Sequence, residues 1–246
     1  MNQNNPSIMR KLAITLLCAA AWMGAFAQSD AQKGKEFFDQ ELYAKALPFL
    51  KKAANAGDID SEVRLAYMTF TGNEVEMDRE HAYAMIDKCI AKGSAYAMSQ
   101  RALFMLMDSR TEEERKHAVE WFKRAALAGD ADAAVYMVNC LRSAKNKQAG
   151  TDEEIVKYCR VAADAGNMEG LAWLGVYTFK GLGGITKDEA EGLALIEQAY
   201  AKSERNSFEK NCYEAAVILR NHFLKNGDAK AGAIQSALKK YHPEKR

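Results

Sequence analysis

The sequence predicts an all-α protein, an α/α solenoid of stacked helix–turn–helix repeats with a period of about 36 residues. A short phrase recurs along the chain and ends three times in Ala-Gly-Asp or Ala-Gly-Asn, and once in Lys-Gly-Ser. Its glycines are Gly57, Gly93, Gly129 and Gly166, which lie 36, 36 and 37 residues apart. The 246 residues include 3 Pro and no useful run of alternating apolar and polar residues, so helices are favoured over strands.

Composition and charge exclude two classes of protein. A hydrophobic content of 48% with 27% charged residues is typical of a folded domain and excludes intrinsic disorder. The chain has 34 basic and 33 acidic residues, and residues 1–27 contribute only Arg10 and Lys11. The remainder has 32 basic and 33 acidic residues, a net charge of −1. We therefore expect no nucleic-acid partner, since such proteins usually carry clustered positive charge.

Residues 1–27 have the organisation of a secretory signal peptide. Arg10 and Lys11 precede an apolar run of 15 residues, and Ala25-Phe26-Ala27 matches the small-x-small pattern of a signal-peptidase site. The run is shorter than the 20 or so residues that span a bilayer. We expect a periplasmic or secreted protein with no stable membrane span after cleavage at Ala27.

Two alternatives to cleavage remain at this end of the chain. In the first alternative the segment is retained as a membrane anchor, but the polar stretch that begins at Gln28 argues against this. In the second, a lipid is attached at Cys18, but the bulky Leu17 before it matches a bacterial lipobox poorly.

Each turn glycine is part of a combined stop and start signal for helices. A glycine in the left-handed conformation ends one helix. The residue after it has a short polar side chain that accepts a hydrogen bond from the first turn of the next helix. These predicted N-caps are Asp58, Ser94, Asp130 and Asn167.

The first helix of three repeats is predicted to start at a capping box, a Thr followed three residues later by Glu. The pairs are Thr111 with Glu114, Thr151 with Glu154, and Thr186 with Glu189. Pro48 lies in the opening helix of the first repeat, where it either kinks the helix or marks a late start.

These signals divide residues 28–246 into a repeat solenoid with capped ends. The predicted repeats are 46–81, 82–117, 118–154, 155–191 and a degenerate 192–226. A lone helix over residues 30–44 precedes them, and a polar cap helix over 229–241 follows the turn Asn226-Gly227-Asp228. Residues 207–241 are expected to form two helices, which are separated by this turn. Such terminal helices matter because an unpaired terminal repeat exposes its apolar face.

Two segments carry a family resemblance. Leu174–Gly181 is followed by Gly183, Gly184 and Asp188-Glu189-Ala190, and Trp121–Gly129 and Tyr158–Gly166 both read aromatic-x₃-Ala-Ala-x₂-Gly. The pattern resembles the Sel-1-like repeat (SLR), an all-helical relative of the tetratricopeptide repeat, over about residues 35–203. The resemblance implies a non-enzymatic scaffold that binds a protein or peptide partner, and the signal peptide implies that this scaffold is exported. Lys202-Ser203 departs from the family pattern where Ala-Gly is expected.

No catalytic, cofactor-binding or metal-binding motif is found in the sequence. His-Glu-x-x-His, Gly-x-Ser-x-Gly, a phosphate loop and Cys-x-x-Cys are absent. His81 and His117 occupy the same repeat position, and a metal site would need further ligands. We expect no catalytic residues, no cofactor and no metal. The alternative is an exported hydrolase of cell-wall or β-lactam substrates. Family members linked to β-lactams have a cysteine pair in every repeat, and this sequence lacks that pattern.

The candidate partner-binding residues are Tyr136 and Trp173. They are the seventh residues after their turn glycines, where the earlier repeats have Arg64 and Gln100. The position is usually polar in the resembled family, which implies exposure, and neighbouring exposed aromatics are enriched at binding hot spots. Alternatively, both rings belong to the core, or the loop of residues 143–150 covers them.

Cys140 and Cys159 are a possible disulfide. Cys140 is expected on the second helix of the third repeat and Cys159 on the first helix of the fourth, so the two helices should be neighbours. An oxidising compartment favours a bridge. Small buried thiols are the alternative, because Phe104 and Phe122 occupy the equivalent places in other repeats. The number of thiols in the denatured, unreduced protein distinguishes the two.

We predict that the mature protein begins at Gln28, because Ala25-Phe26-Ala27 ends the apolar run. N-terminal sequencing of protein from the cell-envelope fraction should read from this residue. A sequence that still includes residues 1–27 would contradict cleavage.

Overall fold

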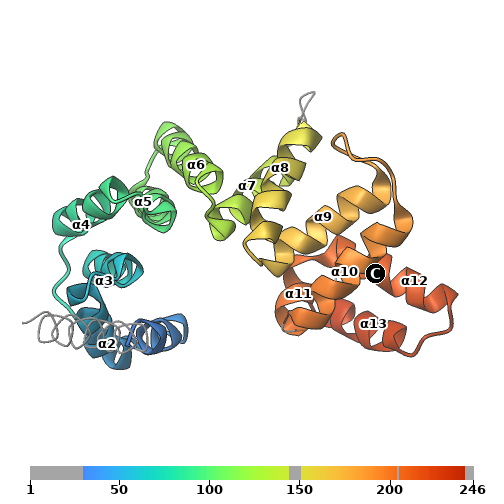
Figure 1. Ribbon diagram of the computed structural model, residues 1–246, viewed down its shortest axis with the longest axis horizontal. Helices are drawn as coiled ribbons and strands as arrows, with labels where there is room; N and C mark the ends of the chain where they lie inside the picture. The colour runs from blue at the N-terminus through green and yellow to red at the C-terminus, as the bar shows by residue number, and fades with distance from the viewer. Residues whose placement is uncertain (1–29, 144–150, 204, 242–246) are drawn as a thin grey trace, which may run out of the picture. The chain divides into compact units, whose positions relative to one another are not determined.

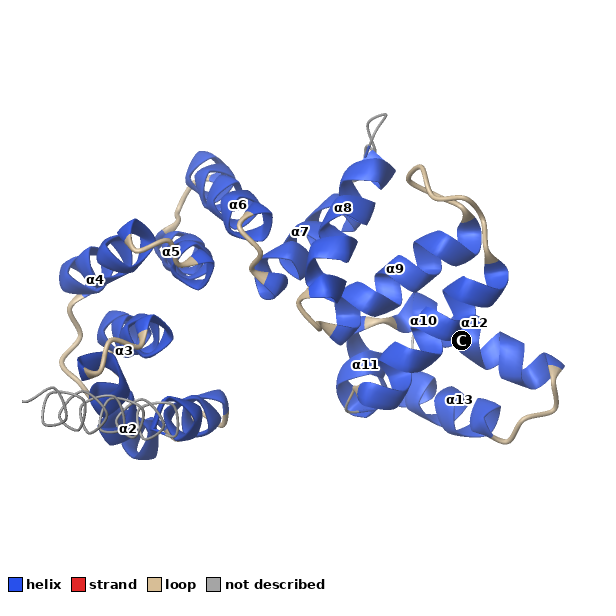
Figure 2. Ribbon diagram, in the orientation of Figure 1, coloured by secondary structure: helices blue, strands red, loops and turns tan. Residues whose placement is uncertain are grey.

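The computed structural model describes residues 30–143, 151–203 and 205–241. Within these ranges every regular element is a helix and none is a strand (Figure 2). The predicted all-α fold is therefore confirmed. The predicted signal peptide, residues 1–27, and all but Ser143 of the loop 143–150 lie outside the described residues.

The chain divides into two compact units, Met1–Phe104 and Met105–Arg246, which we call the N-terminal and C-terminal units (Figure 1). The N-terminal unit has a helix over residues 30–39, then α2 (Tyr43–Asn55), α3 (Ile59–Thr71), α4 (Arg79–Ala91) and most of α5 (Ala95–Asp108). The C-terminal unit has α6 (Glu112–Leu127), α7 (Ala131–Ser143), α8 (Thr151–Asp164), α9 (Met168–Lys180), α10 (Glu189–Lys202), α11 (Arg205–Asn211), α12 (Tyr213–Lys225) and α13 (Lys230–Tyr241).

The core of the N-terminal unit is built from small and aromatic side chains. Helix α3 packs against both α2 and α4. Phe70 of α3 and Phe104 of α5 are fully buried, and their rings stack with centroids 4.1 Å apart. Alanines such as Ala66 and Ala82 are among the other buried members of this cluster, and their small side chains let the helices approach closely.

In the C-terminal unit, each of the helices from α6 to α10 packs against the next. Helix α12 then packs against α9, α10 and α13, so α9 has neighbours on several sides. Two glycines bring α9 and α10 into backbone contact. A Cβ atom on Gly175 would lie 2.8 Å from the carbonyl oxygen of Gly192, and one on Gly192 would lie 2.5 Å from the amide nitrogen of Phe179.

The four predicted turn signals are confirmed. Gly57, Gly93, Gly129 and Gly166 have φ angles between +82° and +101°. The amide of the residue after each glycine bonds back to a carbonyl of the helix that has ended, as Asp130 N does to Ala125 O at 3.0 Å. The same residue then caps the next helix through its side chain. The caps are Asp58, Ser94, Asp130 and Asn167, at 2.7 to 3.1 Å.

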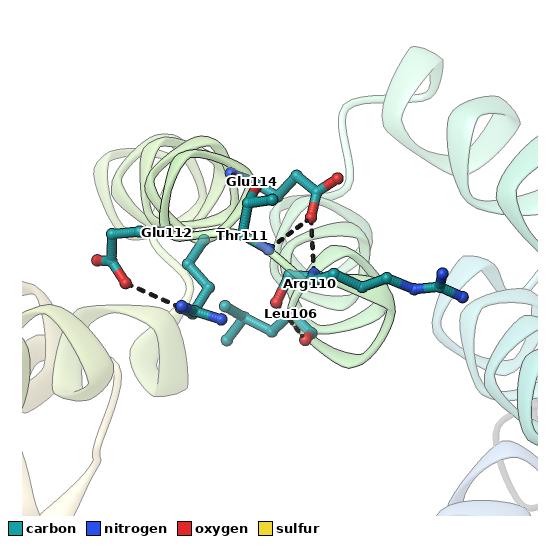
Figure 3. Close-up of polar contacts among 7 residues, drawn as sticks. Leu106, Arg110, Thr111, Glu112 and Glu114 are labelled. Carbon is teal, nitrogen blue, oxygen red and sulfur yellow. Dashed lines mark hydrogen bonds and ion pairs between the residues drawn. The ribbon is translucent and has the colours of Figure 1, made fainter.

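One of the three predicted capping boxes is confirmed. The Thr111 hydroxyl accepts from the Glu114 amide at 3.2 Å, while the Glu114 carboxylate accepts from the amides of Thr111 and Arg110 at 2.9 and 2.6 Å (Figure 3). The hydrogen bonds from the Arg110 and Thr111 backbone amides lower the pKa of the Glu114 carboxyl group. Thr151 is the first residue of α8, and the residue before it lies outside the described ranges.

The prediction of a capping box at Thr186 is wrong, because α10 begins three residues later. Asp188 is the N-cap, and its carboxylate accepts from the Glu191 amide at 2.9 Å. Gly181, with φ +67°, packs against Lys187, which keeps this part of the connection outside the helix. Asp78 caps α4 in the same way, through the amide of His81.

Both ends of the solenoid differ in detail from the prediction. The first helix ends at residue 39, not 44, and α2 continues through Pro48 from its start at Tyr43. Residues 207–241 form parts of three helices instead of two, because the chain breaks at Cys212, where φ is −117° and ψ is 44°. The turn at Gly227 and α13 are as predicted. No helix in the described part of the chain has the length and apolar content needed to cross a membrane.

We predict that Gly129→Ala destabilises the protein by about 1 kcal/mol, because an L side chain is strained at a φ of +101°. No neighbouring atom lies within 4 Å of the added methyl group, so the effect is conformational. The control is Gly232→Ala in α13, which has equal space but helical backbone and should be neutral or stabilising. Urea denaturation measures both, and equal effects would contradict the conformational explanation.

Candidate binding cavities of the C-terminal unit

The expectation that Trp173 is exposed is wrong. Its side chain is 2% exposed, while Tyr136 is half-buried. Arg64, at the equivalent place of the first repeat, is 8% exposed, so the position faces inward in both repeats. Trp173 is buried further because α9 packs against α8, α10 and α12. Whether either ring binds a partner stays a prediction.

The rings of Tyr136 and Trp173 have different neighbours. Tyr136 stacks on Phe122 of α6, with centroids 4.0 Å apart and an interplanar angle of 23°. Burial, together with a hydrogen bond to Cys140, raises the pKa of the Tyr136 hydroxyl to about 12. Trp173 lies beneath the guanidinium group of Arg142, whose Cζ is 3.2 Å from the ring centroid. Among the described contacts the expected ladder of the two rings is not present.

Arg142 joins three helices of the C-terminal unit. It lies at the end of α7, covers Trp173 of α9, and donates from Nη2 to Glu214 Oε2 of α12 at 3.0 Å. Lys180, at the end of α9, pairs with the other oxygen of Glu214. The Glu214 carboxylate is therefore held by two cations, and α12 is fixed against α7 and α9.

A cavity of about 410 Å³ lies beside this cluster, and we call it the basic cavity. Its walls come from the end of α7, the middle of α9 and the junction of α11 with α12. The charged residues in its walls are two cations and the already paired Glu214. Arg142, Trp173, Lys210, Asn211, Glu214 and Val217 are among the lining residues.

A second cavity of about 410 Å³, the acidic cavity, shares Asn211 with the first. Its walls come from the starts of α7 and α9 and from α11. Both of its charged residues are carboxylates, and no Lys or Arg is among the described residues that line it. The lining includes Asp132, Asn167, Glu169, Ser207, Phe208 and Asn211. We call the two together the paired cavities.

Glu169 is the most perturbed carboxylate of the paired cavities. Burial raises the pKa of its carboxyl group, and a 3.1 Å hydrogen bond from Asn139 Nδ2 and the charge of Arg142 oppose this rise only in part. Asp132 accepts a long hydrogen bond of 3.4 Å from Asn167 Nδ2. The acidic cavity therefore holds one carboxylate that is partly desolvated and a second nearer to solvent.

Cys140 and Cys159 lie on α7 and α8, which pack against each other as predicted. Both are free thiols in the structure, as are Cys89 and Cys212. Burial raises the pKa of the Cys159 thiol from 9.0 to about 12, and that of Cys89 to about 11. The thiol count in solution remains the test of the possible disulfide. Within the described residues, no group of three or more His, Cys, Asp or Glu side chains is placed to hold a metal ion.

Comparison with solved structures identifies the repeat. A Sel1 repeat protein from Oxalobacter formigenes superposes with a TM-score of 0.53 and 24% sequence identity, covering 65% of this chain and 46% of its own. A protective antigen of uropathogenic Escherichia coli strains, which displays an SLR fold, gives a TM-score of 0.50 and 26% identity, covering 90% and 48%. The chain has the Sel1-like repeat fold. It spans about half the length of these SLR structures.

No protein-family model matches the sequence, and no curated protein matches it. The assignment of the SLR fold therefore depends on the solved structures and on the recurring turn sequences around Gly57, Gly93, Gly129 and Gly166, and both indicate this fold.

Most residues that line the paired cavities were not predicted from the sequence, among them Arg142, Glu169, Lys210 and Asn211. These residues come together because α11 and α12 pack against α9, which also contacts α7, and no local pattern specifies this packing. One signal was present: Lys202-Ser203 departs from the SLR pattern, immediately before the part of the chain that covers Trp173.

We predict that Trp173→Ala lowers the free energy of unfolding by about 3 to 5 kcal/mol, because it removes a buried indole and leaves a cavity. Trp121→Ala is the control, since Trp121 is partly exposed and its loss should cost clearly less. Urea titration of both variants measures the difference. A melting temperature unchanged by Trp173→Ala would restore the interpretation of this residue as an exposed contact.

Proposed function

We propose that the chain is an exported, non-enzymatic repeat scaffold that binds a protein or peptide partner at the paired cavities. The observation that carries the proposal is the placement of two cavities of about 410 Å³ side by side, with residues from α7, α9, α11 and α12 in their walls. Cavities of this size suit side chains or short segments. Stacked helical repeats commonly present such surfaces to proteins.

The chemistry of the cavities suits a polar partner. Each cavity combines charged groups with an apolar wall, Trp173 and Val217 in one and Phe208 in the other. Opposite charges in neighbouring cavities give a partner orientation and specificity. The fold of the SLR structures supports the same class of function by analogy.

Export is part of the proposal and is supported by the sequence of residues 1–27, with the periplasm or the cell exterior as the destination. The alternative of an exported hydrolase acting on cell-wall or β-lactam substrates predicts turnover of nitrocefin or of a muropeptide by the purified protein. Turnover that a single substitution abolishes would overturn the non-enzymatic assignment.

The partner test compares two charge reversals in pull-downs from envelope extract, read by quantitative mass spectrometry. Lys210→Glu places a carboxylate in the basic cavity, and we expect it to reduce recovery of a specific partner about tenfold or more. Lys157→Glu is the matched control at an exposed position of α8, and it should leave recovery unchanged. Equal recovery by both variants would place binding elsewhere on the chain.

A further inference from the structure

We infer that the paired cavities bind the carboxyl end of a peptide, with its terminal carboxylate in the basic cavity and a primary-amine side chain in the acidic cavity. The inference rests on the proposed function and names the class of partner. It follows from the charges, the apolar walls and the separation of the two cavities.

The charge asymmetry defines the ends of the ligand. In the basic cavity, Glu214 is paired with Arg142 and Lys180, so Lys210 and Arg142 give the lining a net positive charge. A guanidinium and an ammonium together recognise a carboxylate through charge-assisted hydrogen bonds. Asp132 and Glu169 are the charged residues among those that line the acidic cavity, so this cavity suits a cationic group.

The apolar side chains in the walls of both cavities favour charged groups that carry hydrocarbon over small inorganic ions. Trp173 and Val217 line the basic cavity, where they suit the side chain of a terminal residue. Phe208 lines the acidic cavity, where it suits the methylene stem of an aminoalkyl side chain. Asn211 borders both cavities, and its amide has a donor and an acceptor for a peptide bond that passes between them.

The separation of the cavities sets the length of the ligand. Glu169 and Trp173 are four residues apart on α9, about 6 Å along the helix. Asp132 and Arg142 are ten residues apart on α7, about 15 Å. An extended peptide advances about 3.3 Å per residue. A carboxylate and an aminoalkyl side chain separated by two or three residues, about 7 to 10 Å of extended backbone, therefore fall between these two values.

The probe is N-acetyl-Lys-Ala-Ala with a free carboxylate, titrated into the full chain by isothermal calorimetry. Acetylation leaves the lysine side chain as its sole amine. We expect a dissociation constant below about 1 mM. Two neutral analogues, the C-terminal amide and the peptide with norleucine in place of lysine, should each bind about tenfold more weakly, because each loses one charged contact.

Two substitutions assign each end of the peptide to its cavity. Lys210→Met should weaken the free acid about tenfold and leave the amide unaffected, while Asp132→Asn should weaken the lysine peptide and leave the norleucine peptide unaffected. The matched controls, Lys157→Met and Glu153→Gln at exposed positions of α8, should change the binding of none of the three peptides. Unchanged melting temperatures show that the variants are folded.

The outcomes separate this inference from the proposed function. No binding of the free acid at 1 mM, or equal binding of all three peptides, would overturn the inference. If the pull-down partner is still lost in Lys210→Glu, the proposed function survives such a result. If the peptide binds as expected and the pull-down shows no difference between Lys210→Glu and Lys157→Glu, the cavities bind peptides, but the partner recovered from envelope extract binds elsewhere on the chain.

Discussion

The fold depends on one local constraint, a reversal of the chain at a left-handed glycine followed by a short polar residue. Gly57, Gly93, Gly129 and Gly166 adopt a φ that other residues rarely reach, and nothing lies within 4 Å of a Cβ atom placed there. The residue after each glycine takes part in both helices, because its amide completes the first and its side chain begins the second. Only three residues lie between the two helices of each pair, so the pairs leave their turns with a similar geometry.

The paired cavities arise where this regularity ends. Beyond α10 the chain forms three helices, and α12 lies against α9 and α10. Trp173, at a position that faces inward in the first repeat as well, is buried further here because α12 also packs against α9. Arg142 and Glu214 then connect the last complete helix pairs to the terminal helices, and both residues also contribute to the basic cavity. Stability and the candidate site therefore share the same side chains.

Local chemistry could be predicted from the sequence, whereas packing between distant segments could not. The turn caps and the box at Thr111 were predicted because the interacting atoms lie within five residues of one another. The capping box predicted at Thr186 was wrong because Asp188 competes with Thr186 as the N-cap of α10, and the glycine-rich connection favours the later start of this helix. The burial of Trp173 and the opposite charges around Asn211 depend on helices more than 30 residues away, where periodicity carries no information about which face is covered.

The backbone contact between α9 and α10 has a consequence for ligand fit. Gly175 and Gly192 leave no room for a methyl group between the helices. Helix α10 in turn packs against α12, which contributes Glu214 and Val217 to the basic cavity. A side chain at Gly192 would clash with the backbone of Phe179 and separate α10 from α9, and α12 is packed on both helices. The spacing of α9 and α10 therefore bears on the position of Glu214 and Val217, although neither glycine lines the basic cavity.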